Sequence, residues 1–138
     1  MAVRLRAHHL LCLLTYVGEG YSAGFIANLD QITTRLRAGE DIHLVDGPDD
    51  ICAPLLGSEQ DHCAGPSAAE RDQIAASAIP ELLGQDLTAG TRLSLDEAEL
   101  ARLRRAFTSG VIRAACSGCE WADLCTSIAA RVYEGTRL

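Results

Sequence analysis

The residues of this chain best suited to chemistry are its six cysteines, three of which fall within one short segment. Cys116 and Cys119 form a Cys-x-x-Cys pair, and Cys125 follows after five further residues. The turn inside a Cys-x-x-Cys pair brings both sulfurs to the same side, so that one segment gives two thiolates to one metal centre. The spacing therefore predicts a metal–thiolate centre near the start of the last helix, where backbone N–H groups favour negative charge.

Two more cysteines lie in the middle of the chain. Residues 46–66 read as an irregular loop, and this loop contains Cys52 and Cys63. A loop of this length without regular structure is unusual in a compact domain unless it is functional or clamped. We therefore expect Cys63 or Cys52 to supply the fourth thiolate and to clamp the loop against the metal centre.

Other candidate ligands are less specific. His8 and His9 precede Cys12 by about one helical turn, so they could complete a metal shell or form hydrogen bonds to sulfur. They could equally be ordinary core and surface side chains. His62, beside Cys63, is a further candidate nitrogen ligand, and the sequence shows no nucleophile–base pair, so an enzymatic role stays open.

Composition excludes several classes of protein. The 138 residues include no lysine, which rules out a Schiff-base lysine and a Gly-x-x-x-x-Gly-Lys phosphate loop. A net charge of −7 disfavours nucleic-acid binding. The apolar run 10–14 is too short for an export signal or a membrane span of roughly 20 residues, so we expect a cytoplasmic protein. In a reducing cytosol, cysteines indicate metal or redox chemistry rather than structural disulfides.

The hydrophobic pattern predicts a mainly α protein that forms a single compact helical domain over residues 1–138. Ser22, Ser67 and Ser94 are the expected N-caps. The last helix should bury a stripe that includes Val132. A small two-stranded ribbon is expected from residues 42–45 and 91–95. The predicted helices cover residues 8–17, 23–38, 68–79, 95–109 and 121–134.

A disulfide-exchange site would use the same Cys-x-x-Cys pair at a helix start. That reading requires a βαβ context, which the mainly helical pattern lacks. Cys125 could also be a small core residue of its helix.

The motifs together resemble domain-of-unknown-function family 1284, a set of short bacterial and archaeal proteins. The resemblance covers nearly the whole chain and implies iron–sulfur binding, with no reaction attached to it. The strings that carry it are Arg6-Ala-His8-His9-Leu-Leu-Cys12, Gly18-Glu-Gly20-Tyr21-Ser22, Gly47-Pro-Asp-Asp-Ile-Cys52, His62-Cys63, Arg71-Asp72 and Ile112-Arg113-Ala-Ala-Cys116-Ser-Gly-Cys119-Glu-Trp121-Ala-Asp-Leu-Cys125.

Two functions are compatible with these residues. The first is a [4Fe–4S] cluster protein in electron transfer or redox sensing, with Cys116, Cys119 and Cys125 as ligands, Cys63 or Cys52 as the fourth, and a redox or protein partner. The alternative is a zinc-stapled interaction module, in which four cysteines close a tetrahedral shell without redox chemistry.

Overall fold

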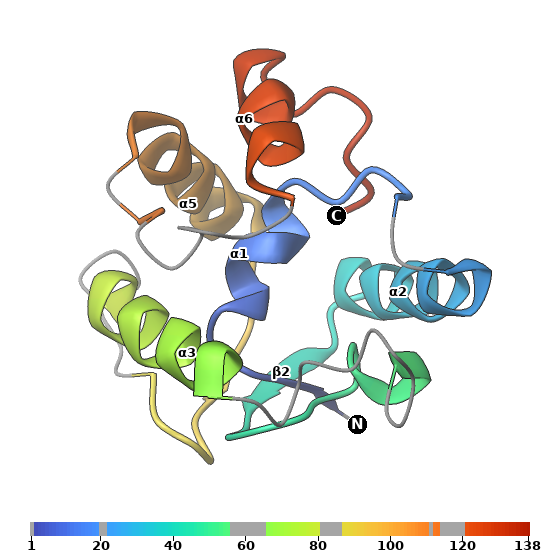
Figure 1. The fold of residues 1–138 in the computed structure, drawn as a ribbon, viewed down its shortest axis with the longest axis vertical. Coiled ribbons are helices and arrows are strands. Elements are labelled where there is room, and N and C mark those ends of the chain that lie inside the picture. Colours follow the sequence, from blue (N-terminus) through green and yellow to red (C-terminus); the bar gives the residue numbers. More distant parts are fainter. Residues whose placement is uncertain (1, 20–21, 56–65, 81–86, 111, 114–120) are drawn as a thin grey trace.

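A computed structural model of the chain describes residues 2–19, 22–55, 66–80, 87–110, 112–113 and 121–138 (Figure 1). The described part is mainly α, as predicted. Its elements are β1 (Ala2–Leu5), α1 (His9–Leu14), α2 (Ala23–Arg37), β2 (Asp41–Leu44), the short 3-10 helix η1 (Ala53–Leu55), α3 (Pro66–Ala78), β3 (Arg92–Leu93), α5 (Glu97–Ser109) and α6 (Ala122–Ala130).

The strands form one small sheet in the order β1-β2-β3. β2 pairs antiparallel with β3, with Ile42 opposite Leu93, which confirms the predicted ribbon. β1 is an addition that the sequence analysis missed, and it pairs parallel with β2. Its buried Val3 and Leu5 flank the exposed Arg4 in the alternation of a strand. An alternating pattern of only four residues does not distinguish a strand from the residues that precede a helix.

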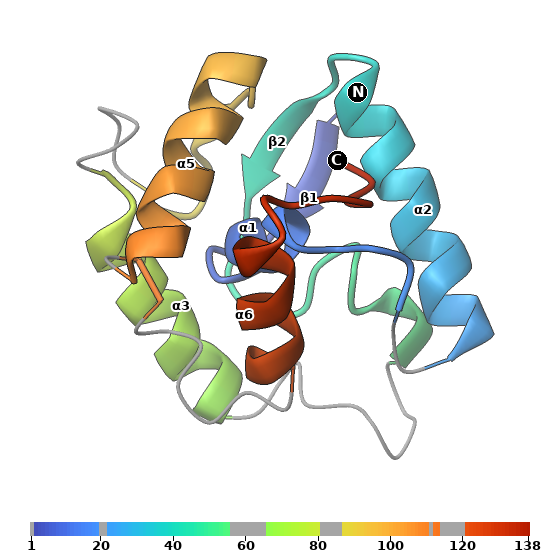
Figure 2. The same ribbon diagram turned by 90° about the horizontal axis from the view of Figure 1, so that it is seen from above.

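α1 lies at the centre of the molecule, surrounded by α2, α3, α5 and α6 (Figures 1 and 2). Its four leucines are at most 2% exposed, whereas Cys12 is exposed. A helix that is apolar on nearly all sides is one that other elements enclose. The predicted helix over 8–17 is therefore present but shorter, because it ends at Leu14.

The two long outer helices follow their predicted patterns closely. The hydroxyl of Ser22 accepts a hydrogen bond from the backbone N–H of Phe25 at 3.1 Å and caps α2 as expected. α5 ends at Gly110, whose φ of +87° is left-handed. Its N-cap is Asp96 and not the predicted Ser94, because the Asp96 carboxylate accepts from the Glu99 N–H at 2.8 Å.

The other two helices differ from prediction at their ends. α3 begins at Pro66, a favoured first helical residue, so Ser67 lies within the helix and not before it. α6 ends at Ala130, and Val132 adopts a φ of +57° and is 85% exposed. The predicted apolar stripe of the last helix therefore stops before Val132. Among the described residues, no helix is long and apolar enough to cross a membrane.

A buried phenol connects α1 to α2. The Tyr16 hydroxyl donates to Asp30 Oδ1 at 2.8 Å, and Arg137 donates to the same oxygen at 2.7 Å. Burial and the hydrogen bond to Asp30 raise the pKa of Tyr16 from 10.0 to about 12. The folded state thus keeps the phenol protonated at a pH where the unfolded chain ionises it.

We expect Tyr16 to ionise above the ordinary pKa of tyrosine in an alkaline titration of tyrosinate absorbance. The difference in tyrosinate absorbance between wild type and Tyr16→Phe should be negligible at pH 10 and appear only toward about pH 12. Stability from this contact is complete below pH 10 and is lost as the pH rises to about 12. A Tyr16 signal with an ordinary midpoint would contradict the buried hydrogen bond.

Candidate metal centre

Two segments that are distant in sequence meet at one edge of the sheet. β1 and β2 run parallel, so the residues that follow them, 6–9 and 45–52, leave the sheet on the same side. The backbone N–H of Val45 donates to the carbonyl of Leu5 at 2.9 Å and joins the two segments. Strand pairing therefore places the two adjacent histidines beside the loop that carries Cys52.

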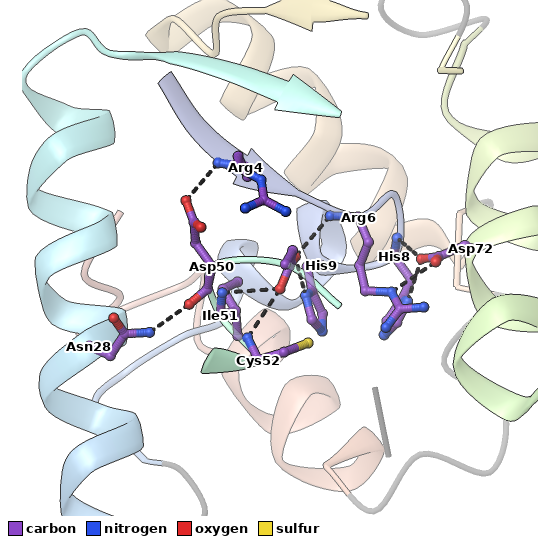
Figure 3. Close-up of polar contacts among 10 residues, drawn as sticks. Arg4, Arg6, His8, His9, Asn28, Asp50, Ile51, Cys52 and Asp72 are labelled. Atoms are coloured by element: carbon purple, nitrogen blue, oxygen red, sulfur yellow. Dashed lines mark hydrogen bonds and ion pairs between the residues drawn. The ribbon is translucent and has the colours of Figure 1, made fainter. Parts of the chain in front are cut away.

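The carboxylate of Asp49 holds these segments together through its contacts with Arg6, His9, Ile51 and Cys52, which Figure 3 labels. Its Oδ2 accepts from the backbone N–H of Arg6 at 2.8 Å and from Nδ1 of His9 at 2.7 Å. Its Oδ1 accepts from the backbone N–H groups of Ile51 at 3.0 Å and Cys52 at 3.1 Å. The Asp49 side chain is fully buried, and these four hydrogen bonds satisfy it.

The protonation of this pair follows from the same contacts. Burial alone would raise the pKa of Asp49, but the charge and hydrogen bond of His9, together with the backbone hydrogen bonds, outweigh burial and lower it. An ionised carboxylate only accepts hydrogen bonds, so Nδ1 of His9 carries a proton. A metal on the opposite nitrogen, Nε2, would then complete the arrangement of a metal-ligating histidine whose Nδ1 proton is held by a carboxylate.

A second aspartate holds the neighbouring histidine. Asp72, on α3, accepts from Nδ1 of His8 at 2.7 Å and from the backbone N–H of His8 at 3.1 Å. Its other oxygen accepts from Nε of Arg6 at 2.8 Å, and the Arg6 side chain is only 1% exposed. Burial, the charge of His9 and that of Arg6 lower the pKa of His8 against the opposing effect of Asp72. His8 is therefore a neutral imidazole at neutral pH.

The two imidazoles lie side by side, each held through Nδ1. Their ring centroids are 4.4 Å apart and their planes are inclined by 59°. Both side chains are 13% exposed, so they are largely enclosed but reachable. Within the described part of the chain, both rings contact their aspartates through Nδ1, which leaves each Nε2 for a metal or a hydrogen-bond donor.

His9, Asp49 and Cys52 form a group whose possible ligand atoms all lie within 4.8 Å of one another. This group contains a nitrogen, an oxygen and a sulfur donor, and both Asp49 and Cys52 are buried. Cys52 is disulfide-bonded in the structure. Its sulfur is therefore a metal ligand only after reduction, because a ligating cysteine must be a thiolate.

The structure describes two of the five predicted thiolate ligands. It brings Cys52 to His9 and Asp49, and it places Cys125 in α6, where the Thr15 hydroxyl donates to its sulfur at 3.0 Å. Cys12 is exposed on α1. The other predicted ligands (Cys63, Cys116 and Cys119) and His62 lie outside the described residues.

Sequence reasoning missed the two aspartates that hold the histidines. Asp49 lies 40 positions from His9, and Asp72 lies 64 positions from His8. The local hydrophobic pattern does not indicate side-chain pairs at such sequence separations. The available signals were the position of Asp49 just after a strand and the Arg71-Asp72 string, which carried the family resemblance without a role of its own.

Fold and site define the class as a mainly α protein with a small sheet and a histidine–aspartate–cysteine group capable of holding a metal ion. The chain belongs to the family described as "Protein of unknown function (DUF1284)", whose model matches residues 20–125. No curated protein and no solved structure matches the chain.

We expect Asp49→Asn to destabilise the reduced, metal-free protein by about 2 kcal/mol or more. The new amide group cannot accept from all four donors, and a buried donor left unsatisfied costs about 1–3 kcal/mol. Denaturant unfolding under reducing conditions measures the loss.

Asp50→Asn is the matched control for this measurement. The carboxylate of the neighbouring Asp50 accepts one hydrogen bond, from the backbone N–H of Arg4 at 2.8 Å. The amide oxygen of an asparagine can accept the same hydrogen bond. Its cost should stay within about 0.5 kcal/mol. Equal costs for the two variants would show that Asp49 does not hold the site together.

Proposed function

We propose that this chain binds an iron–sulfur cluster, with [4Fe–4S] as the favoured type, and acts in electron transfer or redox sensing. The ligands are Cys116, Cys119 and Cys125, with Cys63 or Cys52 as the fourth. The observation that carries the proposal is the thiol spacing together with the position of its third cysteine in the first turn of α6. Such a cluster supplies one-electron chemistry, and the chain supplies ligands and a shielded position.

The surroundings of Cys125 fit a thiolate ligand. Its thiol is half-buried and not part of a disulfide. The hydroxyl of Thr15, itself only 4% exposed, donates to this sulfur at 3.0 Å. A hydrogen bond to the charged form favours the thiolate, and hydrogen bonds to ligating sulfurs tune the potential of a cluster.

Arg113 offers a second fit to an anionic cluster. Its Nη1 donates to Thr126 Oγ1 at 2.6 Å and its Nη2 to the carbonyl of Ala122 at 3.1 Å, so the guanidinium lies against the first turn of α6. Its Nε is buried and, within the described part of the chain, lacks a hydrogen-bond partner. A buried donor without an acceptor is costly, and the sulfide of a cluster is an acceptor of suitable charge.

A zinc-stapled interaction module is the second candidate function. The observation that favours it is the His9–Asp49–Cys52 group, because nitrogen, oxygen and sulfur donors all suit zinc. In this case the metal would organise the loop over residues 46–66 for a protein partner. Redox chemistry would then be absent.

The site of action we propose is the cytoplasm, with a redox or other protein partner. The buried position of the apolar run 10–14 in the central helix α1 supports this compartment. The net charge of −7 favours a protein partner over nucleic acid.

Protein purified without oxygen should be brown and contain iron and acid-labile sulfide. Cys116→Ala and Cys119→Ala should each lose nearly all of the iron, because each removes one of the thiolates that hold the cluster. Cys12→Ala is the control, with a smaller effect. Iron and sulfide analysis, with optical spectra, measures the loading.

Two results would contradict the iron–sulfur proposal. One is equal iron content in Cys119→Ala and wild type. The other is colourless protein after anaerobic reconstitution with iron and sulfide. Stoichiometric zinc without sulfide, in protein isolated without added metal, would support the interaction module instead.

Thr15→Val should make the reduction potential of the cluster more negative. The substitution removes the hydroxyl that donates to Cys125 and changes the volume of the side chain little, so the more negatively charged reduced cluster loses a stabilising contact. Thr15→Ser keeps the hydroxyl and should keep a potential close to that of wild type. Spectroelectrochemical titration compares the three proteins, and an unchanged potential in Thr15→Val would argue against Cys125 as a ligand.

A further inference from the structure

We propose that Nε2 of His9 and Sγ of Cys52 bind one metal ion, and that Asp49 is the residue that positions His9 for it. This inference rests on the zinc form of the proposed function, because two protein ligands on one tetrahedral ion suit a mononuclear metal, whereas each iron of a [4Fe–4S] cluster binds three sulfides and a single protein ligand. It chooses Cys52 over Cys63 as the ligand from the loop. It also selects His9 among the candidate nitrogen ligands His8, His9 and His62.

The distances are suitable for a shared metal ion. Two ligands on one tetrahedral metal, at about 2.3 Å for sulfur and about 2.0 Å for nitrogen, are separated by about 3.5 Å. The possible ligand atoms of His9 and Cys52 lie within 4.8 Å of each other.

Asp49 acts as a positioning residue because its lone pairs are already used. A carboxylate has about four acceptor positions, and four hydrogen bonds within the chain fill them. Direct metal binding would leave buried backbone N–H groups of Arg6, Ile51 or Cys52 without an acceptor. The contact that Asp49 makes with Nδ1 of His9 is instead the carboxylate–histidine–metal arrangement, which fixes the tautomer and aims the opposite nitrogen at the metal.

His8 does not belong to this ligand group. Its Nδ1 and backbone N–H both bond to Asp72, on α3, and its nitrogens are outside the set of atoms within 4.8 Å. The neighbouring pair His8–Asp72 therefore fixes the turn that carries His9. Figure 3 shows the two histidines held from opposite sides, one by α3 and the other by the loop before Cys52.

The disulfide of Cys52 makes metal binding dependent on reduction. A dithiol reductant donates two electrons and two protons to the disulfide, which becomes two thiols, and the reductant becomes a disulfide in turn. Metal binding then releases the thiol proton of Cys52 to solvent. The oxidised protein cannot use this sulfur as a ligand, so one atom serves two mutually exclusive states.

The test uses the full chain, reduced with a dithiol that is removed before Co²⁺ alone is added under anaerobic conditions. Reduced wild type should show a thiolate-to-cobalt charge-transfer band. In the oxidised protein this band should be weaker, because Cys52 is then in a disulfide and contributes no thiolate. Affinity for Co²⁺ should fall about 10–100-fold in Asp49→Asn, and at least as far in His9→Ala and Cys52→Ser. His43→Ala, on β2, and Asp50→Asn are the matched controls and should bind as wild type does.

A second readout identifies the nitrogen directly. Pulsed EPR of the Co²⁺-loaded, reduced protein should show a ¹⁴N coupling in wild type and in His43→Ala that is absent in His9→Ala. Circular dichroism shows which variants fold, and if Asp49→Asn does not, the His9 and Cys52 variants decide. Co²⁺ affinity unchanged in folded His9→Ala, or a wild-type spectrum without ¹⁴N coupling, overturns the inference.

These outcomes separate the inference from the proposed function. Iron and sulfide in wild type, with no effect of His9→Ala, refute the nitrogen ligand and leave the iron–sulfur function in place. Cobalt binding that depends on His9 and Cys52, in a protein that takes up no iron or sulfide, refutes the cluster and supports the ligand pair.

Discussion

The geometry of the site depends on one buried, ionised carboxylate. Asp49 is fully enclosed, and a charge in such surroundings is tolerated only when it is hydrogen-bonded. Its donors come from two segments: Arg6 and His9 follow β1, and Ile51 and Cys52 follow β2. Because the strands are parallel, both segments reach the carboxylate from the same edge of the sheet. The need to satisfy one side chain thereby fixes a histidine and a cysteine beside each other.

The same contacts also determine where the central helix begins. Arg6 is nearly inaccessible and pairs with Asp72, which also holds His8. The turn between β1 and α1 is thus tied to α3 through Asp72 and to the loop after β2 through Asp49. α1 then runs into the middle of the surrounding helices with its leucines buried on most sides. Core packing and the placement of the imidazoles are consequently parts of one structure, so loss of either aspartate affects both.

Those parts of the fold that depend on local pattern could be predicted from the sequence. The cap at Ser22, the apolar series from Phe25 and the end of α5 at Gly110 each follow from neighbours within one or two turns. The sequence did not decide between two nearby capping residues of α5. Ser94 and Asp96 both carry a side-chain oxygen just before this helix, and the structure uses Asp96. The role of Asp49 could not be predicted, since it depends on a parallel strand pairing between residues about 40 positions apart.

The chemistry of the cysteines illustrates the same limit. Spacing alone identifies a thiol-rich segment, but it assigns no partner to Cys52, whose surroundings come from the β1–α1 turn. An imidazole beside a thiolate gives a metal ion less negative charge than two thiolates would. The disulfide state of Cys52 competes with ligation for one sulfur, so the redox poise of the compartment, rather than metal affinity alone, determines how much of the proposed centre is assembled.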